Sequence, residues 1–122
     1  MKKILIIDDD PSLQDLLRMI FERAGYAVSI ESNGNKILNN EYTCPDIFLL
    51  DRYLSGVDGL DICRHLKSDI HCNHIPVVMI SASPDIATTA FQYGANEFVE
   101  KPFEIAELLR TVAKHFPKAV EK

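Results

Sequence analysis

The stretch KILIIDDDPSLQDLLRMIFERAGY, residues 3–26, places a short apolar run directly before a helical pattern. Residues 4–7 are apolar without alternation, which is typical of a strand buried on both faces of a parallel sheet. Asp10 is a favourable N-cap, Pro11 suits the first helical position, and Gly25 suits the end of the helix. Between them, apolar residues recur on one helical face: Leu13, Leu16, Leu17, Ile20, Phe21 and Ala24. The stretch therefore predicts one strand and one amphipathic helix, the first unit of an α/β fold.

The same alternation continues along the chain. Further candidate strands lie at residues 26–30, 47–50, 77–80 and 97–99. The helix expected around residues 34–41 should be short or frayed, because Asn and Gly are frequent there. Stronger helices should begin near Asp58, at Ser83 and after Pro102, and the last should bury Ile105, Leu108, Leu109, Val112 and Phe116. Five strands alternating with five helices predict a doubly wound, five-stranded parallel α/β sheet covered on both faces.

Composition indicates a single compact domain. The chain has 122 residues, of which 47% are hydrophobic and 25% charged, and only six residues follow Phe116. We therefore expect one domain over residues 1–122 and no output domain. The net charge of -5 argues against direct nucleic-acid binding. The four apolar residues before Asp8 are too few for a secretory signal, and no apolar run approaches the ~20 residues of a membrane span.

Three cysteines, Cys44, Cys63 and Cys72, bear on the cellular compartment. Their number is odd and no C-x-x-C spacing is present. Disulfide frameworks are typical of small secreted domains with an even number of cysteines. We therefore expect thiols rather than disulfides, in a reduced cytoplasmic setting.

Charged residues follow three of the predicted strands. Asp8 and Asp9 come after the first strand, Asp51 after the third and Lys101 after the fifth. The carboxyl ends of parallel strands share one crevice, so these side chains should converge. Gathered carboxylates repel one another and favour a hard cation such as Mg²⁺, and a lysine adds a second positive charge. This combination suits phosphoryl chemistry, whereas Asp10 is explained by helix capping.

Four motifs together resemble the receiver domain of two-component response regulators over almost the whole chain. They are IIDDDPSL at residues 6–13, LLDRYLSGVDG at 49–59, MISA at 79–82 and FVEKPF at 98–103. Each motif alone is weak, but their order and spacing are specific. The resemblance implies a flavodoxin-like fold with strand order 2-1-3-4-5.

The resemblance also implies roles for the charged residues. Asp51 would be the phosphoacceptor, and Lys101 would contact the phosphoryl oxygens. Asp8, Asp9, Asp51 and the backbone carbonyl of Tyr53 would hold Mg²⁺. The phosphoryl donor would be a histidine kinase or a histidine phosphotransfer protein. Such a domain catalyses only its own phosphorylation and dephosphorylation and is not an enzyme in the usual sense.

A switch is implied as well. The Ser81 hydroxyl would donate to a phosphoryl oxygen, and Phe98 would change rotamer with it. The bond between Lys101 and Pro102 would be cis. A downstream protein would then bind the face made by the fourth helix, the fifth strand and the fifth helix, with no direct contact to nucleic acid or membrane.

The chain departs from the family pattern at two positions, and a third position is variable. Ser55 stands where the family often has Pro, which should loosen the turn without removing a ligand. Arg52 follows the phosphoacceptor where an apolar residue is usual, and it could either reach solvent or pair with an acid. Tyr53 is bulky at a variable position that influences water access, so we expect a long-lived phosphoryl state.

Two other classes of function stay open on the sequence. A docking module could keep the fold and the pocket residues but act without phosphorylation. A Mg²⁺-dependent phosphatase with Asp51 as nucleophile would need a substrate pocket and a positioned general acid, and neither is evident in the sequence.

Overall fold

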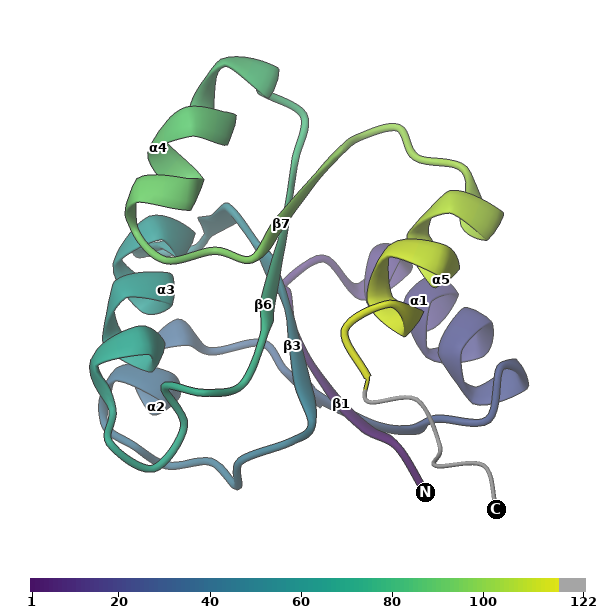
Figure 1. Cartoon of the computed structure of the whole chain (residues 1–122), viewed down its shortest axis with the longest axis horizontal. Helices are drawn as coiled ribbons and strands as arrows, with labels where there is room; N and C mark the ends of the chain where they lie inside the picture. Colours follow the sequence, from purple (N-terminus) through teal and green to yellow (C-terminus); the bar gives the residue numbers. More distant parts are fainter. Residues whose placement is uncertain (117–122) are drawn as a thin grey trace.

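The computed structural model describes residues 1–116, and its centre is a five-stranded parallel sheet (Figure 1). The strands are β1 (Lys3–Ile7), β2 (Ala27–Glu31), β3 (Ile47–Asp51), β6 (Val77–Ser81) and β7 (Glu97–Glu100). Their spatial order is β2-β1-β3-β6-β7. Since β6 and β7 are the fourth and fifth strands of this sheet, the predicted order 2-1-3-4-5 is confirmed.

Helices cover both faces of the sheet. Figure 1 shows α1 (Pro11–Arg23) and α5 (Ile105–Ala113) on one face. On the other lie α2 (Gly34–Leu38), α3 (Gly59–Ser68) and α4 (Ala87–Gln92), and a 3₁₀ turn, Pro84–Ile86, precedes α4. The arrangement is the doubly wound α/β fold predicted above. Each face therefore has its own apolar core.

Alternate residues of the central strands supply the two cores. Ile4 and Ile6 of β1 pack with the α1 and α5 side chains, whereas Leu5 and Ile7 pack with those of α2, α3 and α4. All five residues of β3 are buried. Burial on both faces explains why these strands are apolar without alternation.

The ends of the helices follow from capping. The Asp10 carboxylate accepts a hydrogen bond from the Ser12 backbone N–H at 3.0 Å, and Pro11 occupies the first turn of α1. Gly25 follows the helix with φ +94°, a backbone conformation that glycine adopts without strain. The Asp58 carboxylate caps α3 in the same way, accepting from the Leu60 N–H at 2.9 Å. As predicted, the Asn-rich α2 is short.

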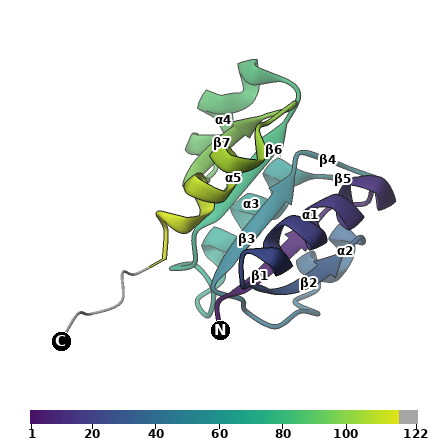
Figure 2. The same ribbon diagram turned by 90° about the vertical axis from the view of Figure 1, so that its right-hand side faces the viewer.

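A two-stranded antiparallel hairpin follows the sheet strand β3 and was not predicted. Its strands are β4 (Tyr53–Leu54) and β5 (Val57–Asp58), joined through Gly56 at φ +77°. Figure 2 shows the hairpin beside the N-terminal end of α1, which follows β1. The segment between Asp51 and α3 is therefore an ordered element rather than a loose turn.

The predicted buried faces of α1 and α5 were too wide. Leu108 and Val112 are fully buried, but Ile105 is 48% exposed and Leu16 is 37% exposed. Ile105 lines an apolar surface groove between α1 and α5, together with Met19. The apolar stripe of each helix is wider than the area that the sheet covers, so its margin meets solvent.

The expectation of three thiols was wrong. A disulfide joins Cys44, in the segment before β3, to Cys72, between α3 and β6, with a Cα–Cα distance of 6.1 Å. Cys63 is a buried thiol in α3. The two bonded cysteines are 28 residues apart, and the pairing of β3 with β6 brings their segments together. Disulfides are typical of oxidising compartments, so this bond does not support the expected reduced setting.

Within residues 1–116, the helices are all too short or too polar to cross a membrane.

Candidate functional site

The predicted site residues meet at the carboxyl edge of the sheet. Asp8 directly follows β1, Asp51 is the last residue of β3 and Lys101 directly follows β7. One oxygen from each of Asp8, Asp9 and Asp51 lies within 4.8 Å of the others. The parallel order β1-β3-β6-β7 brings these strand ends to one edge, as the sequence predicted.

Asp8 has an oxygen without a hydrogen-bond partner. Its side chain is only 1% exposed. Its Oδ1 accepts from the Asp10 N–H at 2.8 Å, but Oδ2 is buried and unpaired among the described residues. Burial raises the pKa of Asp8 to about 6, and the nearby Asp51 charge adds to this, although the Asp10 N–H opposes it. A buried oxygen beside two other carboxylates suits a cation ligand.

The donor set fits Mg²⁺. Carboxylate oxygens are the ligands that this hard ion prefers, and it commonly retains positions for water and phosphoryl oxygens. Tyr53, whose backbone carbonyl was predicted as a further ligand, begins β4 two residues after Asp51. That assignment stays a prediction.

Lys101 pairs with the predicted phosphoacceptor. Its Nζ donates to Asp51 Oδ1 at 2.8 Å. Burial raises the pKa of the Asp51 carboxyl, and the Lys101 ammonium opposes this shift. The Lys101 backbone N–H donates to the Ser81 carbonyl at 2.9 Å, and the peptide bond to Pro102 is cis, as the resemblance predicted. The backbone after β7 thus directs the ammonium to the end of β3.

The two predicted switch residues lie at different depths of the fold. Ser81 ends β6 beside Asp51 and is 1% exposed, and its Oγ accepts from the Ser83 N–H at 3.0 Å. Phe98 lies within β7, opposite Met79, and packs half-buried against the core on the α2–α4 side. Ser81 therefore borders the acidic cluster, whereas Phe98 connects the sheet to the neighbourhood of α4.

Arg52 pairs with an acid, which decides between the two alternatives left by the sequence. Its guanidinium makes two bonds to Asp58, from Nε to Oδ1 at 2.7 Å and from the second terminal nitrogen to Oδ2 at 2.9 Å. These bonds hold the pKa of Asp58 below its usual value. The other terminal nitrogen donates to the Tyr53 hydroxyl at 3.0 Å, and the guanidinium lies 4.6 Å from the centre of that ring. Arg52 thus joins the start of α3 to the segment after Asp51.

Ser55 contacts the acidic cluster, which sequence reasoning missed. Its backbone N–H and its hydroxyl both donate to Asp9 Oδ2, each at 2.7 Å. These two bonds hold the pKa of Asp9 below its usual value. The turn is therefore held by two hydrogen bonds to Asp9 and is not loosened as the sequence predicted. The sequence held one signal for this contact: serine has a backbone N–H and a hydroxyl, whereas proline, the usual residue at this position in the family, has neither.

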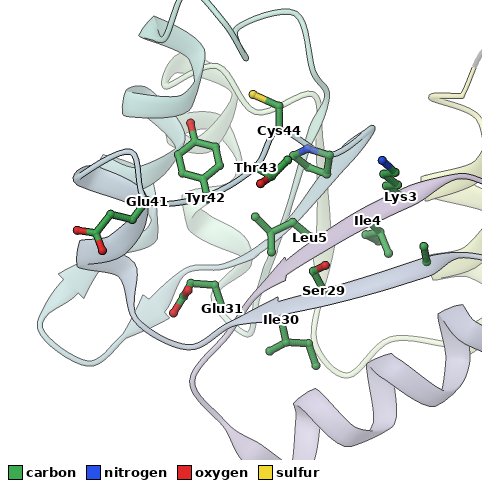
Figure 3. A pocket seen from close by; sticks show the side chains of 12 residues that line it. Lys3, Ile4, Leu5, Ser29, Ile30, Glu31, Glu41, Tyr42, Thr43 and Cys44 are labelled. Carbon is green, nitrogen blue, oxygen red and sulfur yellow. The ribbon is translucent and has the colours of Figure 1, made fainter.

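A hollow of about 430 Å³ lies away from the acidic cluster (Figure 3). It is bounded by β1, β2 and the segment 41–45. Figure 3 shows Glu31 and Glu41 at one end and Lys3 at the other. Neither Asp8 nor Asp51 lines it. The hollow is therefore separate from the candidate site.

Comparison with known proteins gives the family. The response regulator receiver domain model matches residues 4–113. The DNA-binding dual master transcriptional regulator RpaA of Synechocystis is 39% identical over 116 residues, which are 92% of this chain and 48% of that protein. The chain spans about half the length of the curated relatives it matches.

Solved structures agree with the family match. The signal receiver domain of a signal transduction histidine kinase from Syntrophus aciditrophicus has a TM-score of 0.87 and 28% identity, covering 99% of this chain and 96% of that one. The response regulator protein TrrA of Thermotoga maritima, in complex with Mg²⁺-BeF, has a TM-score of 0.85 and 26% identity, covering 95% and 100%. The fold, the acidic edge and these matches together show that the chain belongs to the response regulator receiver domain family of two-component signalling systems.

Proposed function

We propose that this receiver domain is a phosphorylation switch in which Asp51 accepts a phosphoryl group in a Mg²⁺-dependent reaction. The donor is a histidine kinase or a histidine phosphotransfer protein. The observation that carries the proposal is the pairing of Asp51 with Lys101 at 2.8 Å, beside a buried Asp8 oxygen that has no hydrogen-bond partner within residues 1–116. A nucleophilic carboxylate, an ammonium and a cation-binding pair are the groups that phosphoryl transfer requires.

The negatively charged and the positively charged residues have different roles in the proposed reaction. Asp8, Asp9, Asp51 and the Tyr53 carbonyl would hold Mg²⁺, which would offset negative charge on the phosphoryl oxygens when bound. A carboxylate oxygen of Asp51 attacks the phosphorus in line, and the bond from phosphorus to the donor histidine nitrogen breaks. Lys101 already lies at the carboxylate, so its ammonium can follow the negative charge onto the new phosphoryl group.

The added charge supports a conformational switch. A phosphorylated side chain carries about -1.5 to -2 charges and three strong acceptor oxygens. The Ser81 hydroxyl now accepts from Ser83 and can rotate to donate to a phosphoryl oxygen. Phe98 then turns inward, which changes the face made by α4, β7 and α5. Phe91 of α4 is 50% exposed, so α4 itself offers an apolar side chain to a downstream protein.

The domain acts by protein contact and catalyses only its own phosphorylation and dephosphorylation. The net charge of -5 supports protein partners rather than nucleic acid or membrane for residues 1–122. RpaA, whose name includes DNA binding, is about twice as long as this chain. We place the protein in the cytoplasm because it belongs to the response regulator receiver family, although the disulfide between Cys44 and Cys72 is more typical of an oxidising compartment. The Tyr53 side chain is 59% exposed and its hydroxyl accepts from Arg52, so the slow hydrolysis expected from its bulk stays a prediction. A phosphoryl half-life of seconds would contradict it.

Intact-protein mass spectrometry tests the proposal. The protein is incubated with acetyl phosphate with and without Mg²⁺, beside Asp51→Asn and the control Asp61→Asn, which changes an exposed carboxylate of α3. A Mg²⁺-dependent gain of one phosphoryl group in wild type and Asp61→Asn, but not in Asp51→Asn, is expected. If wild type gains none and forms no beryllofluoride complex, a docking module that works without phosphorylation becomes the better explanation.

A further inference from the structure

Ser55 gives this chain two hydrogen-bond donors at the acidic cluster. The backbone N–H and the hydroxyl both reach Asp9 Oδ2 at 2.7 Å. Proline at this position would supply neither donor, because it has no N–H and no hydroxyl. Hydrogen bonds to a charged acceptor are stronger than those between neutral groups. The backbone N–H distance lies at the short end of its range, and the hydroxyl distance is usual for an O–H donor.

The hairpin holds Ser55 in place. Ser55 lies between Leu54, which is 8% exposed and pairs with Val57, and Gly56 at the turn. The bidentate bond between Arg52 and Asp58 closes the base of the same hairpin. The two donors therefore belong to an ordered element that is built into the fold next to α3.

We propose that Ser55 is a positioning residue for the metal site, which orients Asp9 so that its other oxygen faces the cation shared with Asp8 and Asp51. The inference rests on the proposed Mg²⁺ site. Both donors use Oδ2 of Asp9 and leave Oδ1 for the ion. Hydrogen bonds to a ligating carboxylate fix its orientation, and their loss typically lowers metal affinity by 10- to 100-fold.

The test measures Mg²⁺ binding without any phosphoryl donor. Isothermal titration calorimetry gives the Mg²⁺ dissociation constant for wild type and three variants. Ser55→Ala loses the hydroxyl donor and should bind about tenfold more weakly, and Ser55→Pro loses both donors and should bind up to about a hundredfold more weakly. Ser55→Thr keeps both donors and should bind as wild type does.

Two controls separate positioning from folding. Ser68→Ala removes an exposed hydroxyl that donates to the Arg64 carbonyl at 2.8 Å, away from the site, and should leave Mg²⁺ affinity unchanged. Without Mg²⁺, the urea midpoint of Ser55→Ala should fall only slightly, because the lost hydrogen bond is exposed, and the slope of the transition should match wild type. The rise in Tm caused by Mg²⁺ should be smaller than in wild type.

The outcomes are distinct. Wild-type affinity in Ser55→Ala, or tighter binding than in wild type, would overturn the role of Ser55 while leaving the Mg²⁺ site intact. A wild-type protein that binds no Mg²⁺ would overturn the proposed metal site and the inference together.

Discussion

The disulfide between Cys44 and Cys72 makes a quantitative prediction about stability. The perturbation is Cys44→Ser, because Cys44 is exposed whereas Cys72 is 1% exposed, so the substitution removes the bond without burying a new hydroxyl. The bond closes a loop of 28 residues. In the chain-entropy relation, releasing such a loop lowers the free energy of unfolding by about 3.6 kcal/mol at 25 °C. That is a large share of the roughly 5–15 kcal/mol that stabilises an ordinary domain.

Urea unfolding followed by circular dichroism measures this loss. With a slope of about 1–3 kcal/mol/M, the midpoint of Cys44→Ser should fall by at least about 1 M. A reductant should lower the midpoint of wild type to a similar value and leave that of Cys44→Ser unchanged. Thiol titration of the unfolded, non-reduced wild type should find one thiol, that of Cys63. Three thiols, or equal midpoints for wild type and Cys44→Ser under oxidising conditions, would refute the reasoning.

Three further predictions concern the acidic edge and its surroundings. Because burial raises the pKa of Asp8 from 3.8 to about 6, its contribution to stability is complete below 3.8 and is lost as pH rises through about 6. In Mg²⁺-free buffer, the unfolding free energy of Asp8→Asn relative to wild type should therefore increase over this range, and a difference independent of pH would contradict the shift. Arg52→Ala should lower the free energy of unfolding by about 1 kcal/mol. A double-mutant cycle with Asp58→Asn should show coupling, because the ion pair is bidentate and half-buried. Additive effects of the two substitutions would contradict a stabilising ion pair. Lys101→Ala should still accept a phosphoryl group from acetyl phosphate, more slowly, but should lose the phosphorylation-dependent NMR shifts of β7, and wild-type shifts would refute its role in the switch.

The sequence predicted the features that depend on local chemistry. Apolar runs marked the five strands of the sheet, and Asp10, Asp58 and Gly25 marked helix ends, because capping and left-handed turns involve only neighbouring residues. The strand order and the cis bond before Pro102 came from the resemblance, and both are confirmed. The meeting of Asp8 with Asp51 was also predictable, since parallel strands end at one edge.

Contacts that depend on the tertiary structure could not be predicted from the sequence. The hairpin after Asp51 has strands of only two residues, too short for any periodic pattern. The partner of Arg52 lies six residues along the chain and depends on how that hairpin folds. The exposure of Ile105 depends on how much of the apolar stripe of α5 the sheet covers.

The sequence by itself determined the α/β alternation, the family and the residue types at the site. The tertiary structure decided which donors hold each carboxylate and which cysteines meet. Asp9 and Ser55 are 46 residues apart, and Cys44 and Cys72 are 28 apart. Such pairs meet only after the strands have paired, because sheet register and the packing of the segments at the strand ends set the distances between distant side chains.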